Sequence, residues 1–325
     1  METREIRRLE RSVSVIGLGT WQLGADWGDV SEDAADSVLE TAFDAGVTFF
    51  DTADVYGDGR SETFCGRLRE RHPDVFVATK MGRRVAQEPI NYNRDNFLAW
   101  NDRSRANLDV ETLDLVQLHC PPDGVFGDDG VFDALDEMVS GGRIAGYGVS
   151  VETSAQALAA IARPHVATVQ IILNCFRLKP LEEVLPAARE AGVGIIARVP
   201  LASGLLSGRY DENTTFDASD HRNFNRAGEA FDVGETFSGV PFEVGVKAAR
   251  ELSELVEDDS TLAQFALRWI IDQPGVSTVI PGARNPEQVS SNVAAAELAP
   301  LRKEQLDGVR EVYDRLIREH VHDRW

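Results

Sequence analysis

Cysteine and long hydrophobic segments are both scarce in this chain of 325 residues. The three cysteines, Cys65, Cys120 and Cys175, lie far apart and form no CxxC pair, so neither a disulfide framework nor a cysteine metal site is expected. No run approaches the ~20 apolar residues of a membrane-spanning helix. The residues that follow Met1 are charged rather than apolar. These absences predict a cytoplasmic protein with reduced thiols, no membrane partner and no bound metal.

Lysine is also rare, and the charge balance is strongly acidic. Only Lys80, Lys179, Lys247 and Lys303 occur, and 54 acidic residues against 33 basic ones give a net charge of −21. A surface of this sign repels polyanions, so nucleic acid is not an expected partner. The ordinary interpretation is an acidic surface that keeps the protein in solution. A lysine-poor acidic surface also suits concentrated salt, which screens self-repulsion, and we therefore hypothesise a halophilic or salt-tolerant host.

Short apolar segments alternate with longer amphipathic segments along the whole chain. No composition shift or Pro/Gly-rich linker divides it. Eight strand-then-helix units predict an α/β fold, a single-domain (β/α)8 TIM barrel over residues 1–325, with an open doubly wound sheet as the alternative. We expect a long loop without regular structure on the active-site face at about 201–240 and a C-terminal helix at about 302–319. The expected strands lie near 13–16, 47–50, 75–79, 113–119, 144–150, 166–174, 194–200 and 276–280.

A glycine-rich segment after the first expected strand resembles a dinucleotide-binding fingerprint without matching it. The G-x-G-x-x-G fingerprint needs its third glycine so that the following helix packs closely on the strand. This chain has Gly17 and Gly19 but Gln22 at the third position. We therefore predict no Rossmann loop.

Polar residues stand at the ends of three consecutive expected strands. These residues are Asp51, Lys80 and His119, and Tyr56 follows Asp51 closely. In a TIM barrel the carboxyl ends of the strands carry the chemistry. An ammonium lowers the pKa of a neighbouring phenol, a carboxylate holds that ammonium, and an imidazole polarises a substrate oxygen. Each residue could also have a purely structural role: Asp51 as a cap, Tyr56 in packing, Lys80 at the solvated surface and His119 as a hydrogen-bonded side chain. Together they predict a site that passes a proton from Tyr56 to a carbonyl oxygen.

Seven segments, in order along nearly the whole chain, resemble the aldo-keto reductase superfamily. They are Gly17–Gln22 (GLGTWQ), Phe49–Glu62 (FFDTADVYGDGRSE), Ala78–Lys80 (ATK), Leu113–His119 (LDLVQLH), Gly148–Ser150 (GVS), Pro200–Leu206 (PLASGLL) and Ile280–Val289 (IPGARNPEQV). The resemblance implies a barrel that binds extended NADP without a Rossmann motif. It also implies that Tyr56 protonates the carbonyl oxygen while the nicotinamide delivers hydride to carbon. In this tetrad Lys80, paired with Asp51, tunes Tyr56, and His119 orients the substrate.

The resemblance further implies a set of cofactor contacts. Ser150 and Gln170 match the residues that bind the nicotinamide carboxamide, and Arg198 stands where a tyrosine commonly stacks on the nicotinamide. Gly282 and Gln288 replace a lysine and an arginine of many members, which leaves Arg284 to bind the adenosine phosphate. NADP is therefore the expected cofactor, with NAD as the alternative. Gln288 and Asn292 are expected to contact the adenine and ribose. The other expected contacts are Gly19, Thr20 and the backbone around Leu201, Ser203 and Leu205.

The substrate side gives fewer signals. Trp21 and Trp27 are expected to line the mouth of the site, with a cover over the barrel rim as the alternative. The leading interpretation is an NADP-dependent oxidoreductase that reduces an aldehyde or ketone, such as a sugar or an aryl aldehyde, to an alcohol. One alternative is a cofactor-sensing regulatory subunit of the same fold, like a channel β subunit. Another is a lyase or isomerase barrel without cofactor. The sequence leaves monomer and homo-oligomer both open.

Overall fold

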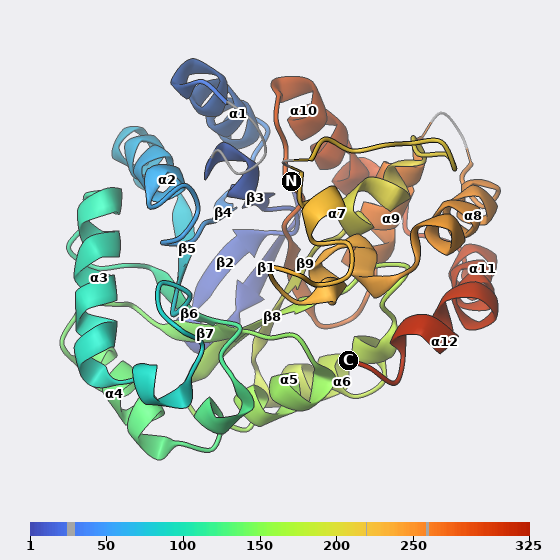
Figure 1. The fold of residues 1–325 in the computed structure, drawn as a ribbon. Helices are drawn as coiled ribbons and strands as arrows, with labels where there is room; N and C mark the ends of the chain where they lie inside the picture. Colours follow the sequence, from blue (N-terminus) through green and yellow to red (C-terminus); the bar gives the residue numbers. More distant parts are fainter. Residues whose placement is uncertain (25–29, 219, 258–259) are drawn as a thin grey trace.

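Eight parallel strands form a barrel in sequence order in the computed structural model, which describes residues 1–24, 30–218, 220–257 and 260–325 (Figure 1). Parallel bridges from Ile16 to Val279 and from Gly19 to Gly282 join the first and last strands, so the sheet closes. This confirms the predicted TIM barrel and excludes the open doubly wound sheet. The strands are β3 (Leu18–Gly19), β4 (Phe49–Asp51), β5 (Phe76–Met81), β6 (Leu115–His119), β7 (Tyr147–Ser150), β8 (Val166–Ile172), β9 (Gly194–Arg198) and β10 (Val276–Val279).

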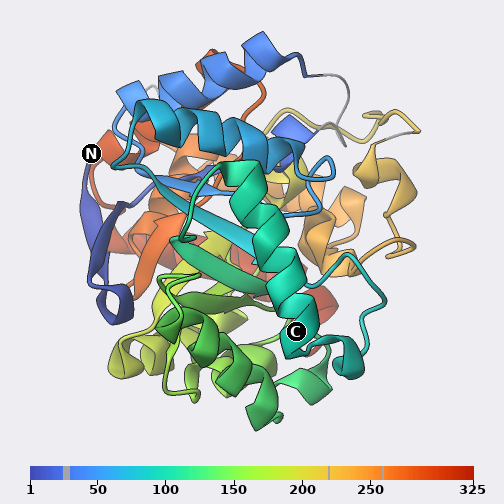
Figure 2. The same cartoon turned by 90° about the vertical axis from the view of Figure 1, so that its left-hand side faces the viewer.

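Helices follow the strands and surround the barrel (Figure 2). Several begin where the sequence predicts, because a capping side chain accepts a free backbone N–H of the first turn. Ser31, Asn93 and Thr153 do this for three of them. The helices are α1 (Glu32–Asp44), α2 (Arg60–Arg71), α3 (Arg94–Leu108), α4 (Asp129–Ser140), α5 (Ser154–Ile161), α6 (Val184–Ala191), α8 (Phe242–Ser253), α9 (Leu262–Ile271) and α10 (Pro286–Ala294).

The chain begins with an antiparallel hairpin that the sequence analysis did not predict. β1 (Thr3–Ile6) pairs with β2 (Arg11–Ser14), drawn in dark blue in Figure 2. The expectation of a barrel strand at 13–16 is therefore right only in part: Val13 and Ser14 belong to the hairpin, whereas Ile16 pairs in parallel with Val279 before β3 begins at Leu18. The physical reason is that Val13 is buried in the same apolar cluster as Ile6 and Phe49, so the hairpin covers the end of the barrel at which β4 begins.

The interior of the barrel is apolar where the strands begin and polar where they end. Phe49, Phe76 and Leu115 lie at the starts of β4, β5 and β6 and pack together in one buried cluster. Polar side chains at the other end are therefore separated from water below by this cluster and by the hairpin. The chemistry that they support is confined to the upper rim.

Residues 201–240 are more regular than the sequence analysis expected. The described residues of this segment, 201–218 and 220–240, contain four short helical turns: η6 (Ala202–Ser207), α7 (His221–Phe224), η7 (Val233–Glu235) and η8 (Phe237–Gly239). The expectation of a segment without regular secondary structure is wrong, because polar side chains within the segment accept hydrogen bonds from backbone N–H groups at the starts of these turns. Asp220 caps α7 and Asp232 caps η7.

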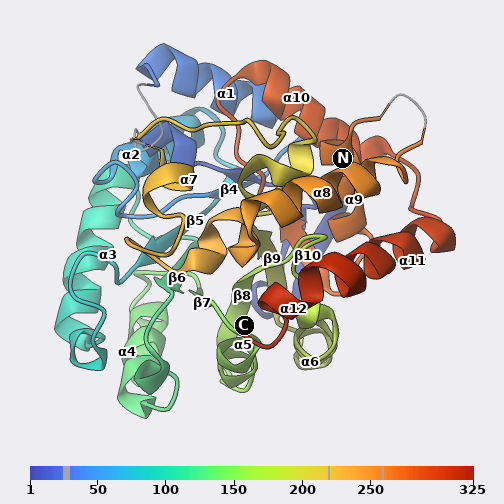
Figure 3. The same cartoon turned by 45° about the vertical axis from the view of Figure 1, so that its right-hand side comes forward.

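The expected C-terminal helix is present with an irregular middle. It consists of α11 (Lys303–Val312), the π-helical turn η10 (Tyr313–Ile317) and α12 (Arg318–Val321). α11 packs beside α8 (Figure 3). In the described part of the chain, no helix combines the length and the apolar character needed to cross a membrane. The three cysteines are free thiols, and Cys65 and Cys175 are buried.

Candidate active site

The four residues expected to form the site meet at the carboxyl end of the barrel. Asp51 ends β4, Lys80 lies one residue before the end of β5, and His119 ends β6. Parallel pairing of β5 with β6 places Lys80 opposite Gln117, two residues before His119. Tyr56 follows β4 on a tight turn in which its backbone N–H donates to the backbone oxygen of Ala53. The fold therefore gathers residues that are up to 68 positions apart in the sequence.

Lys80 is the central residue of this group. It is 1% exposed; its Nζ donates to a carboxylate oxygen of Asp51 and, at 2.8 Å, to the backbone oxygen of Thr52. The same Nζ lies 3.4 Å from the hydroxyl oxygen of Tyr56. Burial alone would lower the pKa of Lys80, but Asp51 and Tyr56 together outweigh it and raise that pKa above its ordinary value. Lys80 is therefore a fixed cation beside the phenol.

The phenol of Tyr56 is under two opposing influences. Burial raises its pKa, and the positive charge of Lys80 lowers it; burial is the larger, so the pKa of Tyr56 lies above its ordinary value. The expectation of a lowered pKa for Tyr56 is therefore wrong, because burial outweighs the charge of Lys80, which acts in the expected direction. The Tyr56 ring lies 5.0 Å from Nζ of Lys80 and 6.0 Å, edge to face, from the ring of His119.

His119 is a neutral imidazole. Burial, followed by the charges of Arg83, Lys80 and Arg198, holds its pKa well below the ordinary value. Its Nδ1 is buried and has no hydrogen-bond partner among the described residues. A neutral imidazole has one N–H donor and one acceptor nitrogen, so His119 suits a substrate oxygen that accepts a hydrogen bond without prior protonation.

Two amide side chains support Asp51 from below. Nε2 of Gln170 donates to Oδ2 of Asp51 at 2.8 Å, and Nε2 of Gln117 donates to the same oxygen at 3.2 Å. Gln170 also lies in register with Ser150, whose Oγ is 3.5 Å from Sγ of Cys120. Both expected carboxamide-binding residues are buried to 1% exposure beneath the rim. Gln170 therefore already fixes the carboxylate that holds Lys80.

A cluster of four charged residues lies beside His119, and the sequence analysis identified only one of them, Arg198. Arg83 follows β5, Glu152 follows β7, Arg198 ends β9, and Glu235 comes from η7 in the long loop. We call these four residues the rim cluster. Three of them extend barrel strands, whereas Glu235 reaches the rim from a distant part of the chain.

The rim cluster is held by charge-assisted hydrogen bonds. Arg198 donates to the carboxylate of Glu152 at 2.8 Å and to the backbone oxygen of Val151 at 3.1 Å, and Arg83 donates to Glu235 at 2.8 Å. Burial raises the pKa of Glu152. Burial would also raise the pKa of Glu235, but Arg83 and Arg198 outweigh it and lower that pKa. Nε of Arg198 is buried without a hydrogen-bond partner in the described residues.

The rim cluster does not suit a metal ion. Ligand atoms of Cys120, Glu152 and Glu235 lie within 4.8 Å of one another. However, Arg83 and Arg198 already bind the two carboxylates and supply the charge that a cation would bring. Burial raises the pKa of the Cys120 thiol to about 12, so this thiol stays protonated. We assign no metal to these residues.

The turn after β9 contains the expected pyrophosphate contacts. Ala202 and Ser203 adopt left-handed backbone conformations, with φ of 47° and 53°, which makes this turn tight. The hydroxyl of Ser203 donates to the backbone oxygen of Glu235 at 3.2 Å and accepts from the backbone N–H of Phe237 at 3.1 Å. Leu205 is buried in the core. Ser203 therefore holds the long loop with its side chain, and the expectation for Leu201, Ser203 and Leu205 rests on their backbone.

The loop after β10 presents one of the expected basic residues. A Cβ on Gly282 would lie 2.2 Å from the side-chain amide of Gln22, so a larger residue does not fit unless that amide moves. Gln288 accepts from the backbone N–H of Arg284 at 2.8 Å, and Asn292 donates to the backbone oxygen of Gly282 at 3.3 Å. Gln288 and Asn292 thus shape the loop that carries Arg284.

A second guanidinium, which the sequence analysis missed, lies near Arg284. Arg222 on α7 donates to Asp220 at 2.8 Å and stacks 4.5 Å from the ring of Phe216. Burial and then the charge of Arg222 lower the pKa of Arg284, so the two cations are within electrostatic range of each other. The long loop therefore brings the Arg222–Asp220 ion pair within electrostatic range of Arg284.

The first loop lies over Tyr56. Gly19 donates from its backbone to Pro281 at 3.1 Å, and the hydroxyl of Thr20 donates to the backbone oxygen of Asp51 at 2.9 Å, so both residues join the loop to the barrel. The half-buried ring of Trp21 stacks 6.1 Å from that of Tyr56 and lies 5.3 Å from that of His221. This placement agrees with Trp21 at the mouth of the site. Trp27 lies outside the described residues.

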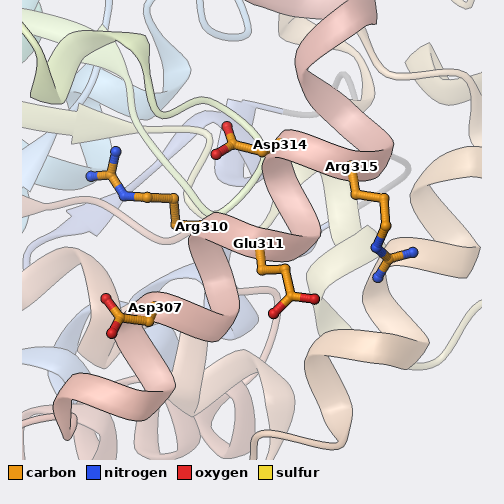
Figure 4. A pocket seen from close by; sticks show the side chains of 5 residues that line it. All are labelled: Asp307, Arg310, Glu311, Asp314 and Arg315. Carbon is orange, nitrogen blue, oxygen red and sulfur yellow. The ribbon is translucent and has the colours of Figure 1, made fainter.

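A separate hollow lies on the outer surface of the C-terminal helix (Figure 4). Its volume is about 530 Å³, and Figure 4 shows that its labelled residues project from the helix surface. Arg315 there is paired with the half-buried Glu251. The hollow therefore resembles a solvated helix face rather than a site. Its lining residues are Asp307, Arg310, Glu311, Asp314 and Arg315.

Comparison with known proteins shows the family. The model of the aldo/keto reductase family matches residues 15–314, and the chain therefore belongs to this family. A glycerol dehydrogenase from Gluconobacter oxydans is 30% identical with a TM-score of 0.80, over 97% of this chain and 96% of that one. An aldo-keto reductase from Klebsiella pneumoniae in complex with NADPH is 25% identical with a TM-score of 0.70, over 96% of each chain. A probable voltage-gated potassium channel subunit beta from Arabidopsis thaliana is 29% identical over 93% of each chain.

Proposed function

We propose that the protein is an NADP-dependent aldo-keto reductase that reduces an aldehyde or ketone to an alcohol, with Tyr56 as the proton donor. The observation that carries this proposal is the contact between Nζ of Lys80 and the hydroxyl of Tyr56, at 3.4 Å, beside a neutral His119. The NADPH complex of the relative from Klebsiella pneumoniae supports the choice of cofactor. The dehydrogenase and reductase names of these relatives support turnover.

The described residues fit a dinucleotide at this rim. Arg284 would supply positive charge for the phosphate on the adenosine, and the tight turn at Ser203 and Gly204 allows close approach of a pyrophosphate. Ser150, which is 1% exposed at the end of β7, would hold the nicotinamide carboxamide. When bound, NADPH supplies the hydride. NAD remains the alternative cofactor.

The chain's own residues handle the oxygen of the substrate. His119 hydrogen-bonds that oxygen and positions it near Tyr56. Tyr56 gives up its hydroxyl proton as negative charge develops on the oxygen. Lys80 then stabilises the phenolate, and Asp51 keeps the ammonium in position with help from Gln170. Because burial disfavours the phenolate, Tyr56 stays protonated until a substrate oxygen accepts its proton.

The test is steady-state turnover with a panel of aldehydes, ketones and sugars, using NADPH and NADH, in buffer with molar salt. We expect reduction of at least one carbonyl class with a lower Michaelis constant for NADPH. No turnover by a folded protein that binds NADPH would favour the second candidate, a cofactor-sensing subunit, which the similarity to the potassium channel subunit supports. A protein that binds neither cofactor would instead indicate a lyase or isomerase.

We also propose that the protein works in the cytoplasm of a salt-tolerant host, in keeping with its net charge of −21 and four lysines. Ion pairs on the surface, such as Arg250 with Glu212, use arginine as the cation. Sedimentation of the purified protein at several salt concentrations would decide between monomer and homo-oligomer.

A further inference from the structure

The barrel strands supply two arginines but only one glutamate to the rim cluster. Arg83 and Arg198 stand at the ends of β5 and β9, and among the cluster members only Glu152 is an acid from the barrel. The second acid of the cluster, Glu235, comes from the long loop. Its carboxylate lies 2.8 Å from the guanidinium of Arg83 and 3.9 Å from that of Arg198. Without Glu235, two guanidiniums would face one carboxylate, and the cluster would carry one uncompensated positive charge.

The cluster is also close to the reacting position. The charges of Arg83 and Arg198 both act on the imidazole of His119. Arg83 follows Lys80 by three residues, and a guanidinium nitrogen of Arg198 lies 3.8 Å from the sulfur of Cys120, which directly follows His119. A group bound between the two arginines would therefore lie on the same side of the rim as a carbonyl oxygen held by His119 and Tyr56.

Contacts that do not involve the Glu235 carboxylate hold the backbone of the long loop near Glu235 in place. Ser203 donates to the backbone oxygen of Glu235 at 3.2 Å. On the other side of η7, the indole N–H of Trp325 donates to Asp232 at 3.0 Å, and the guanidinium of Arg177 lies 4.0 Å from the Trp325 ring. Rotation of the Glu235 side chain thus releases the arginines without moving the loop.

From this arrangement we propose that Arg83 and Arg198 form a subsite for a substrate carboxylate, which the side chain of Glu235 occupies when no such substrate is bound. The proposal rests on the proposed reductase activity and specifies its substrate class: aldehydes or ketones that carry a carboxylate a few bonds from the carbonyl. A carboxylate restores the charge balance that the departing Glu235 removes, and guanidinium groups bind carboxylates through paired N–H donors. The Nε of Arg198, which is buried and without a partner in the described residues, offers one further donor.

The test compares substrates that differ only by the carboxylate. The pairs are glyoxylate with acetaldehyde, succinic semialdehyde with butanal, and 4-carboxybenzaldehyde with benzaldehyde, each assayed with NADPH. We expect kcat/KM to favour the carboxylate by tenfold or more in at least one pair. Arg83→Gln should lower this ratio at least tenfold, because the subsite loses a guanidinium. Glu235→Gln should raise the ratio at least threefold, because the internal competitor is weakened.

The matched control is Arg84→Gln. Arg84 neighbours Arg83 in sequence but donates to Asp54 and Asp58, away from the rim cluster. This variant should keep the wild-type ratio and absolute rates. A preference for the uncharged partner in all three pairs, or a ratio that Arg83→Gln changes less than twofold, would overturn the proposal.

A second measurement separates the subsite from the reductase activity. Calorimetric titration of butanoate into the NADP-loaded protein needs no turnover. We expect binding that Glu235→Gln tightens and Arg83→Gln weakens, each at least threefold. If no carbonyl is reduced but butanoate behaves in this way, the proposed function fails and the subsite stands. If carbonyls are reduced and butanoate affinity is the same in all variants, the subsite fails alone.

Discussion

Nζ of Lys80 lies 3.4 Å from the hydroxyl oxygen of Tyr56 while it donates to the carboxylate of Asp51. The ammonium thus touches both the acid that holds it and the phenol that it stabilises after proton transfer. Because Lys80 is 1% exposed, its charge acts on the phenol with little screening by water. This contact yields the first two predictions.

Replacement of Tyr56 by phenylalanine removes the proton donor and leaves the ring. We expect kcat to fall by about 10²–10⁴, the usual contribution of a positioned general acid, while NADPH affinity, measured by fluorescence titration, stays within about twofold. Tyr313→Phe is the control, since its hydroxyl contacts His322 in the C-terminal helix. A Tyr56→Phe variant with wild-type turnover would remove Tyr56 from the mechanism.

Replacement of Lys80 by methionine leaves the Asp51 carboxylate buried without its cation. We expect a loss of about 3–5 kcal/mol of unfolding free energy, as for other broken buried ion pairs, together with loss of turnover. The double variant Lys80→Met, Asp51→Asn should recover much of the stability and none of the turnover. Denaturant unfolding and steady-state rates measure the two effects. Equal instability of the single and double variants would argue against the pair.

Replacement of Arg284 by glutamine tests the adenosine phosphate site. We expect the Michaelis constant for NADPH to rise about tenfold through loss of a charge-assisted contact worth about 1.4 kcal/mol, and that for NADH to change less than twofold. Arg189→Gln, an exposed residue on α6, serves as the control. If wild-type protein prefers NADH, or if both constants rise together, Arg284 does not bind the phosphate.

Asp54 links stability to pH. It is 0% exposed, neither of its carboxylate oxygens has a hydrogen-bond partner in the described residues, and burial with the nearby Glu62 raises its pKa to about 7. A carboxyl with a raised pKa in the folded state binds a proton on folding. The folded protein therefore loses stability as the pH rises from about 3.8, the pKa of Asp54 in the unfolded chain, to about 7, its pKa in the folded protein. Above that pH the loss stays constant.

Asp54→Asn should remove this dependence. We expect the variant to gain at least about 2 kcal/mol more relative to wild type at pH 8 than at pH 5. Urea unfolding at both pH values measures the difference. Glu297→Gln, a change at an acid whose side chain lies outside this buried pair, should show no such difference. A gain that is the same at both pH values would mean that Asp54 is not protonated in the folded state.

The acidic surface leads to a prediction on salt. With a net charge of −21, the folded chain repels itself, and molar salt shortens the range of this repulsion to about 3 Å. We expect the melting temperature to rise by 10 °C or more between about 0.05 M and 2 M potassium chloride. Calorimetry at the two concentrations measures it. The same melting temperature in both would end the salt-tolerance hypothesis.

Strand and helix order followed from local patterns, and so did the strand-end positions of Asp51, Lys80 and His119. Such patterns depend on neighbours a few residues apart, which the sequence contains. The hairpin at the start of the chain was missed because Val13 is buried in a cluster with Phe49, a residue distant from it in the sequence. The rim cluster gave no local signal either, since Glu235 lies 152 residues from Arg83.

The sequence by itself determined the barrel, the family resemblance and the four residues at the strand ends, because periodicity and short motifs are local properties. Only the tertiary structure decided the charge state of the site. Burial, which depends on the packing of the whole barrel, raises the pKa of Tyr56 and lowers that of His119, so His119 is neutral. The fold also places the carboxylate of Glu235 beside the guanidinium groups of Arg83 and Arg198. Electrostatic energies depend on distance and on the exclusion of water, and the folded chain alone defines both.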